Sequence, residues 1–156
     1  MSATTEIKMA TREEVTAKIL AAKVALGMKW EEIAEMIGQS PVWTAAALAG
    51  QCALSEEEAT LIGEKLGLED LDIKLLQTYP YRGSLTETVP TDPFVYRFFE
   101  IMQVYGIAMK EVAQEEFGDG IMSAIDFSID VKREPNPNGD RVEITYSGKF
   151  LPYKKF

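Results

Sequence analysis

Apolar side chains recur at every third or fourth position through the first half of the chain, from Thr11 to about Pro80. This spacing is typical of amphipathic helices. In the first helix, the face expected to be buried carries four apolar residues: Val15, Ile19, Leu20 and Val24. Ser40 before Pro41, and Ser55 before Glu58, are patterns that begin helices. Glycines follow several helices as stop signals, so we predict a compact bundle of about five helices.

The pattern changes at about Tyr81, where glycine, serine and proline mark a linker that extends to Asp92. Helical spacing returns from Phe94 to about Glu116, and Gly106 is a point at which this helix could break. Beyond it, apolar and polar residues alternate as in β-strands. The apolar positions of the two expected strands are Phe127, Ile129 and Val131, then Val142, Ile144 and Tyr146. Asn138-Gly139 between them predicts a hairpin turn.

The predicted fold class is therefore α+β, with a helical bundle over residues 1–82 and a small α+β domain over residues 83–156. A two-stranded hairpin is only marginally stable in water by itself. The C-terminal half offers few further strands to cover it. We therefore expect this domain to complete itself against a second copy of the chain, as a homo-oligomer.

The chain has no histidine and one cysteine. The lack of histidine excludes Ser-His-Asp and Cys-His catalysis and histidine-ligated zinc. Cys52 cannot form an internal disulfide, and we interpret it as a small buried residue rather than a nucleophile. The polar segment Met1 to Arg12 lacks the apolar region of a secretory signal, and no apolar run is long enough to span a membrane. These features predict a cytoplasmic protein without a membrane partner.

The formal net charge is −9, and a surface this acidic repels nucleic acid phosphates. The helices around Glu32-Ile33-Ala34 nevertheless resemble a helix-turn-helix DNA-binding domain. The helix in the recognition position, Ser40 to Gly50, contains no Lys or Arg, and residues 1–89 hold 8 basic and 14 acidic side chains. We therefore interpret its outer face as a packing surface in preference to a DNA contact: Val42, Trp43, Ala45, Ala46 and Leu48.

Two stretches of the C-terminal half could carry chemistry. Arg97 and Glu100 share a helix face among aromatic neighbours, where a guanidinium is a strong anion site. The alternative is an ordinary ion pair on a solvated helix. In the second stretch, Ser123 follows the tight turn Gly118-Asp119-Gly120, where free backbone amides could cradle a small anion. Here the alternative is a helix-to-strand corner capped by the serine.

Arg82 and Ser84 in the linker could also touch a ligand, although nothing in their spacing requires it. The acidic run Glu56-Glu57-Glu58 is explained by the first turn of a helix, where the helix dipole favours negative charge. The sequence shows no cluster of Cys, His and Asp that suggests a metal.

Three longer motifs stand out in the C-terminal half. They are Pro90-Thr91-Asp92-Pro93 with Tyr96-Arg97-Phe98, Glu100 and Gln103-Val104-Tyr105-Gly106; Phe117 to Ile125; and Gly148-Lys149-Phe150-Leu151-Pro152. Together they resemble the signature of the cyanate hydratase (cyanase) family. The likeness covers essentially the whole chain, although the N-terminal bundle matches more loosely.

The resemblance implies that Arg97, Glu100 and Ser123 are the catalytic residues and that no cofactor is needed. Cyanate would react with bicarbonate as co-substrate to give carbamate and carbon dioxide, and carbamate would decompose to ammonia and more carbon dioxide. The resemblance also implies that the helical domain does not bind DNA, that the C-terminal domains interlock as dimers, and that five dimers form a decamer with active sites between subunits. Two rival hypotheses are a helix-turn-helix transcriptional regulator with a ligand-sensing dimerisation domain, and a non-catalytic assembly protein in which Arg97 and Glu100 only stabilise an interface.

Overall fold

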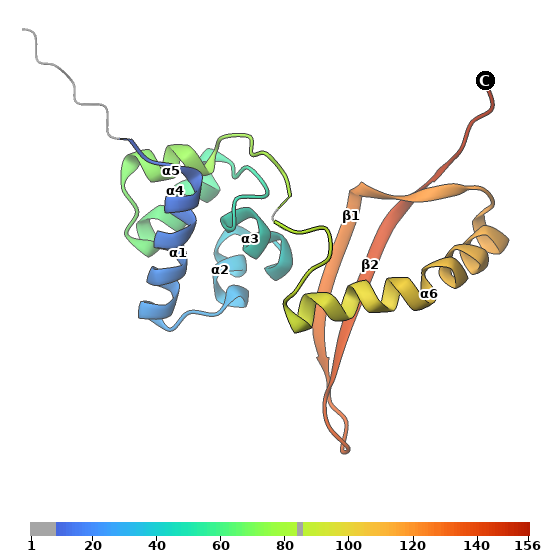
Figure 1. Ribbon diagram of the computed structural model, residues 1–156. Coiled ribbons are helices and arrows are strands. Elements are labelled where there is room, and N and C mark those ends of the chain that lie inside the picture. The colour runs from blue at the N-terminus through green and yellow to red at the C-terminus, as the bar shows by residue number, and fades with distance from the viewer. Residues whose placement is uncertain (1–8, 84–85) are drawn as a thin grey trace, which may run out of the picture. The chain divides into compact units, whose positions relative to one another are not determined.

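The computed structural model describes residues 9–83 and 86–156. Most of the polar N-terminal segment and Ser84 of the linker therefore lie outside the described residues. The chain divides into two compact units, Met1–Gly83 and Ser84–Phe156, as the ribbon in Figure 1 illustrates. The first unit is helical and the second combines a helix with a hairpin, so the fold is α+β.

The described part of the first unit consists of α1 (Arg12–Leu26), α2 (Trp30–Ile37), α3 (Pro41–Leu48), α4 (Glu56–Leu66) and α5 (Asp70–Leu76). The helix starts predicted at Ser40 and Ser55 are confirmed. The Ser40 hydroxyl accepts a hydrogen bond from the Trp43 amide, and Ser55 forms a reciprocal capping box with Glu58. Glycines end α1, α2 and α4, as the sequence predicted for several helices, and they adopt the left-handed conformation typical of such ends: Gly27, Gly38 and Gly67.

The hydrophobic core of the described chain lies entirely in the first unit: Val15, Ile19, Ile33, Ala47, Leu48, Leu54, Ala59, Ile62, Leu66 and Leu76. The predicted burial of Val15 and Ile19 is confirmed, but the prediction was wrong for Leu20 and Val24, which are exposed. The reason is that α1 packs against α4 and α5 along one narrow face. Leu20 and Val24 point away from that face, where no described helix covers them.

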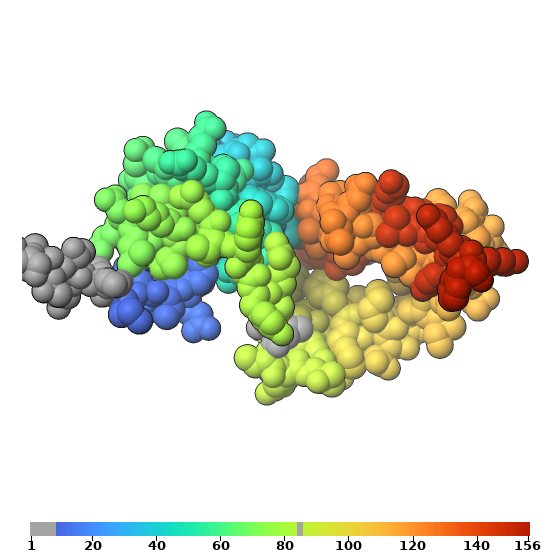
Figure 2. All heavy atoms as spheres, turned by 90° about the horizontal axis from the view of Figure 1, so that it is seen from above, coloured from blue at the N-terminus to red at the C-terminus, as the bar shows by residue number. Residues whose placement is uncertain are grey.

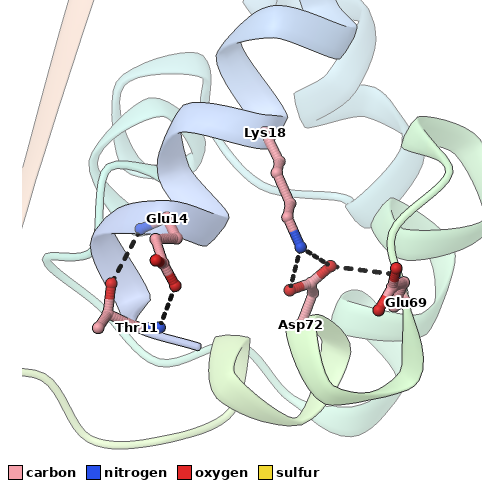
Figure 3. Close-up of polar contacts among 5 residues, drawn as sticks. All are labelled: Thr11, Glu14, Lys18, Glu69 and Asp72. Atoms are coloured by element: carbon pink, nitrogen blue, oxygen red, sulfur yellow. Dashed lines mark hydrogen bonds and ion pairs between the residues drawn. The ribbon is translucent and has the colours of Figure 1, made fainter. Parts of the chain in front are cut away.

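A buried carboxylate ties α1 to α5 (Figure 3). Both oxygens of Asp72 accept hydrogen bonds from the Lys18 ammonium at 3.0 Å, and one also accepts from the Glu69 amide at the start of α5. The Lys18 pKa is raised by its hydrogen bond to Asp72, with the charge of that carboxylate adding to the effect. Asp72 is fully buried, so its charge is compensated by these contacts.

The C-terminal end of α3 is capped by side chains of α1. The Arg12 guanidinium donates to the Ala47 carbonyl, and the Thr16 hydroxyl donates to the Leu48 carbonyl. Half-burial lowers the Arg12 pKa. On α3 itself, Leu48 is buried and Trp43 packs against the core. Val42, Ala45 and Ala46 are only partly buried, so the predicted packing role is met by two of the five residues.

The second unit contains α6 (Pro93–Phe117) and a hairpin of β1 (Gly120–Glu134) and β2 (Arg141–Pro152). The Asp92 carboxylate begins α6 by accepting hydrogen bonds from the amides of Phe94 and Val95. The helix runs unbroken through Gly106, so the break considered from the sequence does not occur. Both strands are longer than the alternating pattern predicted. β1 already begins at Gly120, and β2 continues to Pro152.

The described part of the second unit, residues 86–156, has no hydrophobic core of its own. Within residues 86–156, only Pro90 and Ser123 are buried, and α6 has no buried residue. In Figure 2 the atoms of α6 (yellow) and of the hairpin (orange to red) stand apart over part of their length. The exposed apolar side chains of α6 include Phe94, Tyr96, Ile101, Met102, Val104, Tyr105, Ile107, Met109, Val112 and Phe117. None of the described helices is long and apolar enough to cross a membrane.

Candidate functional site

Arg97 and Glu100 lie in the first turns of α6 and form an ion pair. The guanidinium nitrogen and the carboxylate oxygen are 3.6 Å apart, and the two side chains are 69% and 43% exposed. An exposed pair of this kind contributes little stability, on the order of 0.5 kcal/mol. Within a single chain the pair therefore has the character of the solvated alternative. It becomes a strong anion site only if another surface covers it.

Aromatic rings surround this ion pair along the helix. Phe94 and Phe98 meet edge to face with ring centres 5.2 Å apart, and Tyr96 and Phe99 lie 5.9 Å apart. These rings are only partly covered by their own chain. They provide apolar walls that would lower the local dielectric around the Arg97 guanidinium once a second surface packs against them.

Ser123 lies in a large bulge of β1. Met122 pairs with Phe150 and Phe127 pairs with Gly148, so four residues of β1 (123–126) face a single residue of β2, Lys149. Figure 1 shows β1 turning sharply along its length. Bulges of this kind aim individual side chains and recur beside active sites. The sequence does not predict this bulge, because residues 121–125 have no alternating pattern to reveal its register.

The Ser123 hydroxyl oxygen accepts two hydrogen bonds, from the amide of Ile125 at 3.1 Å and from the amide of Asp126 at 2.9 Å. A serine hydroxyl has two acceptor lone pairs and one hydrogen to donate. Both acceptor positions are used, so the group has its hydrogen left to offer. The Ser123 hydroxyl is therefore arranged to act as a hydrogen-bond donor.

The sequence left two interpretations open for Ser123: free amides that cradle an anion, or a corner capped by the serine. The Ser123 hydroxyl binds two of the neighbouring amides, which favours the capped corner. The turn before it is also used for structure. Asp119 accepts hydrogen bonds from the Gln114 side chain and the Tyr153 amide, while Gly120 packs closely against Phe150. The group that this segment can offer to a ligand is thus the Ser123 hydroxyl hydrogen and not a set of free backbone amides.

The structure does not assemble the three predicted site residues within one chain. In the described residues, Arg97 and Glu100 have polar contacts with each other, whereas those of Ser123 are with its own bulge. Ser123 is nevertheless buried, with 6% of its surface exposed, in a unit where the large apolar side chains are not.

The other candidates have weaker support. Cys52 is partly buried and packs against the core of the helical unit, as expected for a structural cysteine. Arg82 is exposed. Across residues 9–83 and 86–156, no three His, Cys, Asp or Glu side chains are grouped so that they could hold a metal ion.

Both units match models of one protein family. Residues 12–80 match the model described as "Cyanate hydratase, N-terminal", and residues 87–155 match "Cyanate lyase C-terminal domain". The chain is 58% identical to the cyanate hydratase of Methylibium petroleiphilum, over 94% of this chain and 99% of that protein. It is 54% identical to the cyanate hydratase of Mycolicibacterium vanbaalenii, over 92% of this chain and 94% of that protein.

A solved structure gives the same result. The crystal structure of cyanase from T. urticae matches with a TM-score of 0.79 and 37% identity, covering 89% of this chain and 97% of that one. The family resemblance that the sequence motifs indicated is thereby confirmed over both units. The chain belongs to the cyanate hydratase (cyanase) family.

Proposed function

We propose that this protein decomposes cyanate, with bicarbonate as co-substrate, at sites formed between copies of the chain. The observation that carries the proposal is the family match over both units, with relatives that align over nearly their full length. Arg97, Glu100 and Ser123 are the residues that we assign to the reaction, and bicarbonate takes the place of a cofactor.

The chemistry is balanced without a side-chain nucleophile. A bicarbonate oxygen attacks the cyanate carbon, and a carbon–oxygen bond forms to give a doubly charged adduct. The other carbon–oxygen bond of that oxygen then breaks, which releases carbon dioxide and leaves carbamate. The nitrogen takes one proton from bicarbonate and one from solvent. A further proton converts carbamate to ammonia and a second carbon dioxide.

The main barrier is electrostatic, because two anions must meet and form a dianion. A positive charge about 4 Å away stabilises a negative one by about 1 kcal/mol in water and by about 4 kcal/mol at the effective dielectric of a protein surface. Arg97, 69% exposed in one chain, would act near the lower value. We infer that Arg97 side chains from more than one subunit, enclosed at an interface, supply the larger stabilisation.

Ser123 and Glu100 take supporting roles in this proposal. The Ser123 hydroxyl has its hydrogen available, so it can donate to an oxygen of the dianion, and hydrogen bonds to charged acceptors are about twice as strong as neutral ones. Glu100 pairs with Arg97 in the same helix turns and would orient the guanidinium or relay a proton.

We further propose that the chain assembles as a homo-oligomer, a decamer of five dimers. The support is that α6 is apolar around most of its circumference and has no buried residue. A helix with apolar side chains on every face is normally covered on every side. Light scattering should give a mass of about ten times the 17.4 kDa chain.

The direct test is ammonia release from cyanate by the purified protein, with and without bicarbonate. Ammonia should form only when bicarbonate is present, and its release should stop when carbon dioxide is stripped from the buffer. Release that continues unchanged after stripping excludes bicarbonate as the nucleophile. No release under any condition overturns the proposed function.

The role of Arg97 has its own test and a matched control. Arg97→Ala should lower kcat/KM about 100-fold or more, the typical effect of removing one group that stabilises transition-state charge. Arg133→Ala removes an arginine that is likewise exposed and paired, 3.4 Å from Asp140 in the hairpin, and should leave turnover unchanged. An assembled Arg97→Ala protein with near-normal turnover contradicts the assignment.

A further inference from the structure

Gly148 of β2 lies directly against the backbone of Ser123. A Cβ atom placed on Gly148 would collide with the Ser123 carbonyl oxygen and would come within 2.5 Å of Cγ of Met122. Unbonded carbon atoms are comfortable at about 3.5–4 Å. The Met122 side chain could turn away, but the carbonyl belongs to the backbone of the bulge. A side chain at position 148 would therefore push the bulge out of place.

Backbone conformation gives no other reason for a glycine at this position. The described glycines with positive φ are residues 27, 38, 50, 67, 83, 118 and 139, and Gly148 is not one of them. Its φ is therefore one that other residues also adopt, and a glycine inside a strand weakens the strand. A glycine in this setting marks a close approach, and here the approaching group is Ser123.

We propose that Gly148 is a positioning residue for Ser123. Because Gly148 has no side chain, the Ser123 carbonyl can approach it closely, and the four bulge residues fit opposite a single residue of β2. The closed bulge brings the amides of Ile125 and Asp126 onto the Ser123 oxygen, which leaves the hydroxyl hydrogen as the group to be donated. This inference rests on the proposed function, in which the Ser123 hydroxyl donates its hydrogen to an oxygen of the dianion.

A double-mutant cycle tests whether Gly148 acts through Ser123. Gly148→Ala should lower kcat about 100-fold, as expected when a catalytic donor is displaced by about 1 Å. In a Ser123→Ala background the same change should lower kcat less than about twofold, since the hydroxyl is already absent. Independent effects would instead multiply. Met122→Ala should not restore Gly148→Ala, because the carbonyl collision remains.

Amide hydrogen exchange gives a readout that does not depend on cyanate turnover. The Ile125 side chain is 99% exposed, and its amide has the Ser123 oxygen as its partner. Exchange in a peptide that covers the bulge should therefore accelerate in Gly148→Ala. Gly139→Ala is the matched control: it strains the hairpin turn, where φ is +119°, and no other group lies near the added carbon. It should lower stability while leaving bulge exchange and kcat as in the wild type.

Unchanged bulge exchange in Gly148→Ala, or losses of kcat that multiply in the double variant, would overturn the inference. A wild-type protein that is inactive on cyanate would overturn the proposed function instead. In that case the exchange comparison would still decide whether Gly148 holds the bulge in place.

Discussion

Replacing Ile107 with aspartate should disrupt the proposed assembly of copies through α6. Ile107 is 80% exposed in the single chain. Burying an isoleucine side chain stabilises an interface by about 1.5–3 kcal/mol, so about 2 kcal/mol would be lost per chain. In a two-fold interface each substitution occurs twice, which raises the loss to about 4 kcal/mol, and an unpaired buried carboxylate adds to it. A loss of about 4 kcal/mol weakens the dissociation constant by about three powers of ten.

Size-exclusion chromatography with light scattering over a dilution series measures this change. Ile107→Asp should fall to smaller species at concentrations where the wild type remains assembled. Val24→Asp is the matched control, because Val24 is 79% exposed on α1 but belongs to the unit that has its own core. If Ile107→Asp dissociates over the same concentrations as the wild type, the inference from the missing core is refuted.

Three further predictions concern the fold and the chemistry. Asp72 raises the Lys18 pKa above its ordinary 10.5, so this pair stabilises the fold below about pH 10.5 and its contribution is lost as the pH rises further. Melting temperatures should therefore fall more steeply above that pH in the wild type than in Asp72→Asn. Ile62→Ala, at a fully buried core position, should lower the free energy of unfolding by about 2–5 kcal/mol in urea titrations. Because bicarbonate supplies the nucleophile and the first proton in the proposed reaction, and solvent the second, dialysis against a chelator should leave cyanate turnover at the untreated rate.

The helical unit followed closely from local sequence signals. Ser40, Ser55 and the glycines that end helices act within a few residues of themselves, so the sequence alone could indicate them. Burial was harder to predict, because it depends on which neighbours arrive. Leu20 directly follows the buried Ile19 in α1, about 100° further around the helix. It remains exposed because α4 and α5 pack on the face of α1 that carries Val15 and Ile19.

Local sequence patterns predicted the candidate site less well than they predicted the helices. The bulge at Ser123 depends on a shift of register against Gly148, more than twenty residues later in the chain. The pattern of apolar and polar residues within β1 does not predict this shift. By their spacing, Arg97 and Glu100 look like any ion pair on a helix. Only the longer family motifs marked them as candidate site residues. A lone glycine in the return strand was the signal that could have revealed the close approach to Ser123.

The missing core of the second unit also has a kinetic consequence. The helical unit can bury its apolar residues alone, so its refolding should follow first-order kinetics. In the proposed assembly, the α6 and hairpin segments would gain their burial only when chains meet, so their ordering should be bimolecular and accelerate with protein concentration. Before it assembles, a newly made chain would expose unpaired strand edges and aromatic rings, which favour aggregation. Refolding at low temperature, with the chains mixed quickly, should therefore raise the yield of folded protein.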